Sequence, residues 1–160
     1  MNNKQQFRYY GKTGISRTKA FEKKGLAKYS VNLGNMCEFG CTYCYTPSIT
    51  RKQKVLVDII AKGYNLDDIS CYRYPENVLY CVSKDLDNIP RGDNGTVFFC
   101  TTCAPCATRE HTETTIKAIR LIMERARLQV RVLSKSVLIT RGAYELDKYR
   151  DRIVYSLSTG

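Results

Sequence analysis

The chain has 160 residues, of which 43% are hydrophobic and 26% charged, and its formal net charge is +11. This balance is typical of a folded globular protein and excludes a disordered or fibrous chain, while the length suits one compact domain. No apolar run approaches the ~20 residues of a membrane-spanning helix, and the N-terminus lacks the apolar core of a secretory signal, so we expect a cytoplasmic protein with no membrane partner.

The N-terminal part of the sequence is strongly basic. Residues 1–28 are polar and show no clear period, which predicts an irregular or weakly helical extension ahead of a core at 29–160. Residues 1–54 hold eleven lysines and arginines against two acidic residues, so nine of the eleven net positive charges fall there. With Phe7 and Tyr9 among them, these charges suit binding of DNA or RNA; a solvated basic tail is the alternative.

Strands and helices alternate in the remainder of the chain. The apolar patterns predict strands at 27–34, 96–102, 129–135 and 152–159, with helices at 51–63, 111–127 and 143–150. Residues 64–95 are rich in Asn, Asp, Pro and Gly, and are interpreted as an excursion between core elements. The alternation predicts an α/β fold with right-handed βαβ units and a parallel sheet. Because a buried strand at the chain end would expose an unpaired edge, we expect a truncated sequence or a second chain that covers it.

Three of the eight cysteines form a compact motif. Cys37, Cys41 and Cys44 are separated by three and two residues, with Tyr43 directly before the third cysteine. In a chain without an export signal, such cysteines indicate metal or redox chemistry rather than disulfides. Three thiolates bind three irons of a cubane cluster and leave the fourth iron open to bind and activate a substrate.

A zinc site is the alternative for this loop. Closely spaced thiols also suit zinc, and Cys71, Cys81 or His111 would then supply the fourth ligand. Zinc ribbons use two separated Cys-x2-Cys turns, whereas this loop follows a predicted strand of a βα fold. The context therefore favours the cluster.

The loop resembles that of the radical S-adenosylmethionine (SAM) superfamily, in which the open iron of a [4Fe-4S] cluster binds SAM and an electron from the cluster cleaves it to a 5'-deoxyadenosyl radical. Within the superfamily, residues 28–160 are similar to spore photoproduct lyase and its relatives, at the cysteine loop and at the strand ends FFCTT, VLSKS and SLST. The resemblance implies a partial TIM-like radical SAM barrel of about four parallel βα units of the usual six, incomplete at its C-terminus. It also implies a lyase-like activity and a reductant such as flavodoxin or ferredoxin.

The resemblance assigns roles to residues at the strand ends. Tyr43 would contact the SAM adenine, and Lys135 would pair with the SAM carboxylate. The remaining SAM contacts would come from four residues: Thr101, Thr102, Ser156 and Ser158. The two threonines stand where many superfamily members have a glycine-rich segment, so the contact to the SAM amino group departs from the family pattern.

A second cysteine group follows the strand at 96–102. A cysteine at the position of Cys100 returns a hydrogen atom to the product radical in spore photoproduct lyases, so Cys100 is expected to be catalytic; a buried structural cysteine is the alternative. Cys103 and Cys106 have no such counterpart. They are interpreted as ligands of a second iron-sulfur cluster, as a redox pair or as a zinc site.

Two functions follow from the sequence. The first is a radical SAM enzyme that reductively cleaves SAM and acts on a substrate for which nucleic acid is a reasonable candidate. The second is a cysteine-rich metal-binding module that binds nucleic acid without catalysis, or an inactive fragment.

Overall fold

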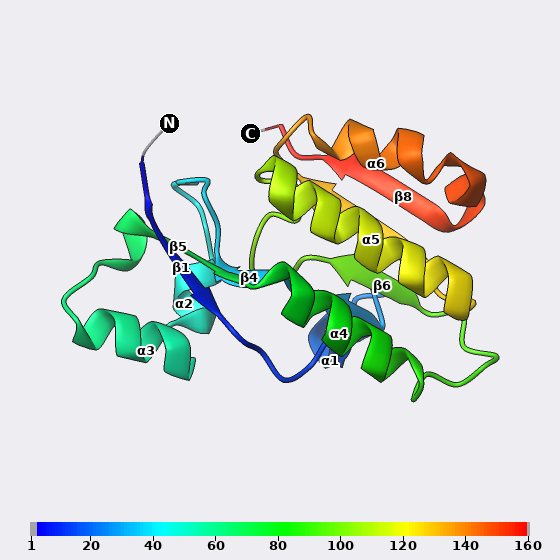
Figure 1. The fold of residues 1–160 in the computed structure, drawn as a ribbon, viewed down its shortest axis with the longest axis horizontal. Coiled ribbons are helices and arrows are strands. Elements are labelled where there is room, and N and C mark those ends of the chain that lie inside the picture. Colours follow the sequence, from blue (N-terminus) through cyan, green and yellow to red (C-terminus); the bar gives the residue numbers. More distant parts are fainter. Residues whose placement is uncertain (1–2, 160) are drawn as a thin grey trace.

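The computed structural model describes residues 3–159, which form two sheets flanked by helices (Figure 1). The larger sheet has the strand order β2-β3-β6-β7-β8. Its strands are β2 (Ser16–Arg17), β3 (Tyr29–Val31), β6 (Thr96–Phe99), β7 (Gln129–Ser134) and β8 (Ile153–Leu157). Neighbours from β3 to β8 run parallel, whereas β2 pairs antiparallel with β3. The predicted α/β fold with parallel strands is thereby confirmed.

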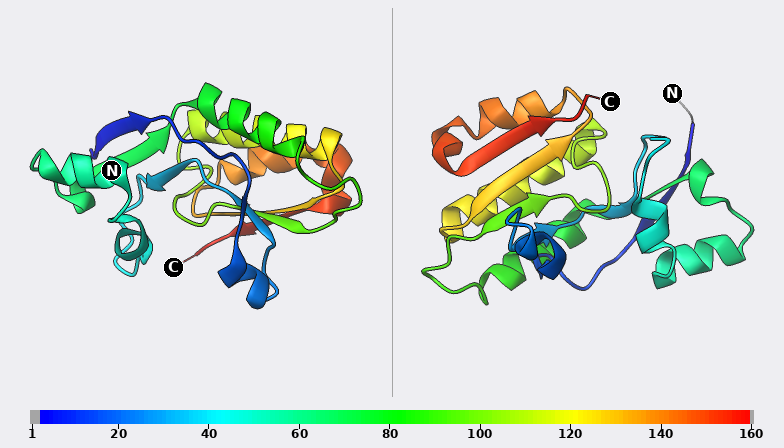
Figure 2. Two further views of the ribbon diagram at one scale, coloured as in Figure 1. Left: turned by 90° about the horizontal axis from the view of Figure 1, so that it is seen from below. Right: turned by 180° about the vertical axis from the view of Figure 1, so that it is seen from behind.

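Helices cover one face of this sheet. They are α4 (Pro75–Leu86), α5 (Arg109–Arg125) and α6 (Ile139–Glu145), followed by the 3-10 turn η2 (Asp147–Arg152). The view from behind in Figure 2 shows the strands in front of these helices. Thr108 caps α5, because its hydroxyl oxygen accepts a hydrogen bond from the backbone N–H of His111 at 3.2 Å.

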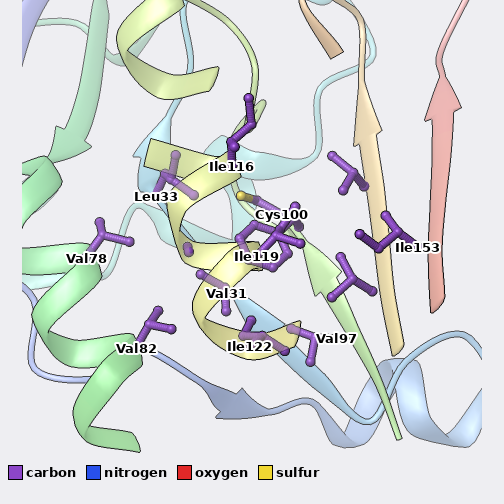
Figure 3. Close-up of a cluster of buried hydrophobic side chains, with 14 of the residues drawn as sticks. Val31, Leu33, Val78, Val82, Val97, Cys100, Ile116, Ile119, Ile122 and Ile153 are labelled. Atoms are coloured by element: carbon purple, nitrogen blue, oxygen red, sulfur yellow. The ribbon is translucent and has the colours of Figure 1, made fainter. Parts of the chain in front are cut away.

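The main hydrophobic core lies between the helices and this sheet. Figure 3 shows isoleucines of α5 and valines of α4 gathered around strand residues such as Val31 and Val97. Alternate residues of β7 are buried against the helices, while Gln129 and Leu133 on the other face are exposed. The period of two along the strand therefore separates a covered face from an open one.

The smaller sheet has the order β1-β5-β4 and includes the N-terminal segment. Its strands are β1 (Gln5–Tyr9), β4 (Gly34–Met36) and β5 (Ile69–Arg73). β1 pairs parallel with β5, and β4 pairs antiparallel with it. Four short elements accompany these strands along the chain: α1 (Lys19–Lys23), α2 (Thr46–Thr50), α3 (Lys54–Ala61) and the 3-10 turn η1 (Leu66–Asp68).

Two sequence-based expectations differ from this arrangement. Residues 64–95 are not an excursion, because they contain the fully buried strand β5 and the twelve-residue helix α4. The basic segment is more ordered than a separate extension, because within residues 3–28 it contributes β1 and β2, which pair with strands of the two sheets, and the short helix α1. The other predicted strands and helices are present near their expected positions, and α6 begins four residues earlier than expected. No helix within residues 3–159 combines the length and apolar character needed to cross a membrane.

Candidate metal centre and adjoining pocket

The cysteine loop connects β4 to α2. The sequence predicts this loop directly after the first strand, whereas the structure inserts β4 between that strand and Cys37. Cys37, Cys41 and Cys44 are free thiols, each partly exposed. The backbone of the loop is held at its start by Lys4, whose ammonium group donates a hydrogen bond to the carbonyl oxygen of Cys37 at 3.3 Å.

All three thiol residues line one cavity of about 450 Å³. Other walls come from the N-terminal ends of β1 and β5, and the lining includes Lys4, Asp67 and Asp68. Within residues 3–159, no three His, Cys, Asp or Glu side chains converge closely enough to hold one metal ion. A cubane cluster needs room and three soft ligands at separate corners, so three thiols around a cavity of this size fit such a cluster.

The zinc alternative draws on residues outside the lining of this cavity, of which Cys71 is the strand partner of the lining residue Met36. Neither Cys71, Cys81 nor His111 is among the lining residues. The Cys81 thiol lies 3.5 Å from the carbonyl oxygen of Gly11, to which it donates a hydrogen bond, and the His111 ring stacks on Tyr72 with ring centroids 3.6 Å apart. The three thiols therefore have no imidazole beside them, and the other anionic donors in the lining are the carboxylates of Asp67 and Asp68.

Cys37 is a neutral thiol in the free chain. Burial raises the pKa of Cys37 to about 11, and nearby Cys103 and Cys44 add to the increase. Because a metal binds the thiolate, loading of this loop has to release the Cys37 proton.

A second pocket, of about 160 Å³, adjoins the cysteine loop at the carboxyl ends of the parallel strands. Cys37 and Cys41 form its loop side. Its strand side consists of residues that follow or end successive strands: Cys100 and Thr101 after β6, Ser134 and Lys135 at the end of β7, and Ser158 after β8. Residues far apart in the sequence thus meet beside the three cysteines.

Tyr43 and Lys135 are in direct contact. The Lys135 ammonium group donates a hydrogen bond to the Tyr43 hydroxyl and lies 4.8 Å from the centroid of its ring. The hydrogen bond raises the pKa of Lys135, so this side chain carries a positive charge at neutral pH. The contact joins the cysteine loop to the end of β7.

Three of the six predicted SAM-contact residues do not line this pocket: Tyr43, Thr102 and Ser156. Thr102 is buried, and its hydroxyl donates to the carbonyl oxygen of Gly34 at 2.5 Å. Ser156 lies within β8, opposite Leu133 of β7. Thr102 and Ser156 therefore contribute to the framework of the sheets around the pocket.

Sequence reasoning missed two residues that fix the strand ends. The side-chain oxygen of Asn32 accepts hydrogen bonds from the backbone N–H groups of Thr101, at 2.7 Å, and of Thr102, at 3.3 Å. The hydroxyl of Tyr45 donates to the carbonyl oxygen of Thr101 at 2.6 Å. The position of Asn32 directly after the buried strand β3 is a signal that could have identified it, whereas Tyr45 carries no comparable signal.

The structure divides the second cysteine group. Cys103 lies beside Cys100, and burial together with the Cys100 thiol raises the pKa of Cys103 well above its usual value. Both residues line the second pocket, and Cys100 also belongs to the hydrophobic core (Figure 3). Cys106 is instead buried next to Thr112 of α5, and burial raises its pKa to about 11.

Comparison of the chain with protein-family models, curated proteins and solved structures finds no match.

Proposed function

We propose that the chain is the core of a radical SAM enzyme related to the spore photoproduct lyase group. The observation that carries the proposal is the composition of the second pocket. The cysteine loop supplies Cys37 and Cys41 to it, and three consecutive parallel strands supply the residues at their carboxyl ends. Active sites of parallel βα barrels are built at this end of the strands.

The strand order supports a partial barrel as the finer description of the fold. In the larger sheet, the parallel strands lie side by side in the order in which they occur along the chain: β3, β6, β7 and β8. One face of this sheet is covered by α4, α5 and α6 (Figures 1 and 2). A βα barrel adds strands in sequence and keeps its helices outside. The opposite face, with Leu133 and Val154 exposed, then corresponds to the inner surface of an open barrel.

Cys37, Cys41 and Cys44 would hold the [4Fe-4S] cluster. When bound, the cluster and SAM together supply the electron transfer that cleaves the SAM sulfonium and produces a 5'-deoxyadenosyl radical. Lys135 and Ser158 line the pocket beside the loop and would position SAM for this reaction. The Lys135 ammonium group would pair with the SAM carboxylate, and the Ser158 hydroxyl would donate a hydrogen bond to SAM. An anchored carboxylate keeps the rest of SAM in one orientation relative to the cysteine loop.

Tyr43 and Thr101 complete the SAM site in this proposal. The Tyr43 ring is largely exposed and presents a flat surface for the adenine, next to the Lys135 side chain that it already contacts. Thr101 is fixed by Asn32 and Tyr45, so its backbone presents a rigid wall to the ligand. Pre-organised contacts of this kind reduce the entropy cost of binding.

Cys100 would return a hydrogen atom to the product radical. It lines the pocket from the strand side, and its immediate neighbour Cys103 is a partly buried thiol whose pKa is raised well above its usual value. The S–H bond is weak enough to quench a carbon radical, and the thiol must be protonated to donate a hydrogen atom.

Anaerobic reconstitution with iron and sulfide tests the proposal. The expected product contains about four iron and four sulfide per chain and, after reduction by dithionite, cleaves SAM to methionine and 5'-deoxyadenosine. Cys41→Ala is expected to lose the iron and the cleavage. Cys81→Ala removes a buried cysteine outside both pockets and serves as the matched control.

A protein that takes up zinc alone and leaves SAM intact under reduction contradicts the proposal. That outcome would instead indicate the non-catalytic metal-binding module. Equal iron loss in both cysteine variants would also contradict it, because the cluster would then not depend on the loop.

A further inference from the structure

A third cavity, of about 280 Å³, lies at the carboxyl ends of β1, β3 and β5. β1 and β5 end at Tyr9 and Arg73, and both residues line the cavity, together with the loop that follows β1. Asn32 and Asn35 form the side toward β3 and β4. No aspartate or glutamate is among its lining residues, so the cavity is polar without negative charge.

Arg73 places an uncompensated positive charge in this wall. Its side chain is buried, its Nε donates to Asn77 at 2.9 Å, and its Nη1 donates to the carbonyl oxygen of Thr13 at 2.6 Å. Its Nη2 has no hydrogen-bond partner, and none of the ion pairs within residues 3–159 includes Arg73. A buried guanidinium without an anion is costly, so it indicates a site for an anionic ligand.

The glycine at position 11 lets the loop pass close to this guanidinium. A Cβ atom at Gly11 would lie 2.6 Å from Arg73 Nε and 2.7 Å from its central carbon. The side-chain amide of Asn77 also bridges the loop, because it accepts from Gly11 N at 2.8 Å and donates to Gly11 O at 3.1 Å. The loop is thus built around the Arg73 side chain rather than resting beside it.

Asn35 supplies a second unpartnered donor. Its side chain is 4% exposed, and its amide nitrogen has no hydrogen-bond partner. The exposed Lys12 and the hydroxyls of Thr13 and Ser16 add further donors around the same cavity. The carboxylate of Asp85 is engaged by the backbone N–H groups of Gly14 and Ile15, and Asp85 is not a lining residue.

We propose that this cavity binds a phosphate group. The cavity wall offers donors of several kinds: a guanidinium nitrogen, an amide, an ammonium group and hydroxyls. Such a set suits the three peripheral oxygens of a phosphate better than the two oxygens of a planar carboxylate. The volume lies near the lower end of the range for ligand pockets, about 300–1,000 Å³. It therefore suits a phosphate with a small attached group rather than a whole cofactor.

The position of the cavity assigns the phosphate to the substrate. Asn32 lines the cavity and also binds the backbone of Thr101, which lines the proposed SAM pocket. A ligand held by Arg73 would thus lie one side chain away from that pocket. This assignment, to a phosphate-bearing substrate such as a nucleotide unit, rests on the proposed function, whereas the phosphate site itself does not.

Calorimetric titration of the metal-free chain with inorganic phosphate tests the site, with acetate at equal ionic strength as the parallel arm. Asn35→Asp replaces the unpartnered amide donor of a lining residue by a carboxylate, and it is expected to weaken phosphate binding by roughly tenfold or more. Lys12→Gln is expected to weaken it about two- to fivefold, as for a partly screened charge. Lys24→Gln, an equally exposed lysine outside the cavity, is expected to bind as the wild type does.

Wild-type binding by Asn35→Asp, confirmed as folded by circular dichroism, would overturn the proposal. Acetate binding as tight as phosphate binding would also overturn it. Equal weakening of phosphate binding in Lys12→Gln and Lys24→Gln would overturn it too, because that result would indicate a general effect of surface charge. The lysine pair keeps the test decisive where Asn35→Asp fails to fold. Because the titration needs neither cluster nor SAM, its failure and the failure of the proposed function remain distinguishable.

Discussion

Burial of the His111 imidazole should make the free energy of unfolding depend on pH. The side chain is 4% exposed, both ring nitrogens lack hydrogen-bond partners, and the ring stacks on Tyr72. Burial, with a smaller contribution from the Arg8 charge, lowers the pKa of His111 to about 4. In the unfolded chain the pKa is near 6.5. Above pH 6.5 the imidazole is neutral in both states, so its titration does not change the free energy of unfolding. As the pH falls from 6.5 toward 4, the unfolded chain binds the proton and the folded chain does not, so the free energy of unfolding decreases.

The magnitude follows from the two pKa values. Between pH 7 and pH 5, protonation of His111 in the unfolded chain alone lowers the free energy of unfolding by about 2 kcal/mol. His111→Phe keeps a ring for the Tyr72 stack and removes the titration. We therefore expect the variant to lose about 2 kcal/mol less stability than the wild type over this interval, whatever its stability at pH 7.

Urea unfolding followed by far-UV circular dichroism at the two pH values measures this difference. All carboxylates titrate alike in both proteins, so the comparison isolates His111. Glu110→Gln is the control, because it removes a half-exposed carboxylate one position before His111 and leaves the imidazole in place. Equal losses in wild type and His111→Phe would refute the reasoning, because His111 would then be accessible to protons in the folded chain.

Three further predictions concern packing, charge and ligand binding. Gly14→Ala is expected to lower the free energy of unfolding by about 3 kcal/mol or more, because its Cβ would lie 2.1 Å from the backbone nitrogen of Val82. Gly92→Ala is the control, because a Cβ there meets open space, and its free energy of unfolding in urea should stay within about 0.5 kcal/mol of the wild type. Burial alone would raise the pKa of Asp93, but hydrogen bonds, chiefly from a lysine and a tyrosine, lower it to about 2. Asp93→Asn should therefore cost about 1–2 kcal/mol at pH 7, and the loss should vanish as acid titration passes from pH 4 to pH 2; a constant loss would contradict this. Lys135→Gln should raise the Kd for SAM about tenfold in equilibrium dialysis without lowering iron content, and unchanged SAM affinity would contradict its assigned role.

Local sequence patterns were sufficient to predict the parallel sheet but not the smaller one. β6 and β7 are apolar strands followed by polar residues, so their positions can be read from a few neighbours. β1 is half exposed and polar, and its stability depends on pairing with β5, which lies far along the chain. α4 has buried positions at Val78, Cys81, Val82 and Leu86, which is helical spacing, but the Asn, Asp and Pro residues around it favoured an interpretation as loop.

The same distinction applies to the candidate sites. The cysteine loop is a local motif, and Lys135 and Ser158 follow apolar strands, so each of them could be proposed from its immediate sequence. Arg73 and Asn35 could not, because each acquires its role only when β4 and β5 pair and bury both side chains. A single arginine or asparagine in an unassigned segment gives no indication that it will be buried without a partner.

The pairing of β1 with β5 also determines when the cysteine cavity can form. Gln5 pairs with Ile69 and Tyr9 with Arg73, so this contact closes a loop of roughly sixty residues, and such distant pairings slow folding. The cysteine loop lies inside that interval, and its cavity takes walls from Lys4, just before β1, and from Asp67 and Asp68, just before β5. During synthesis the three thiols therefore leave the ribosome well before their cavity exists. If the loop holds the proposed cluster, the walls around that cluster are complete only once β1 and β5 have paired.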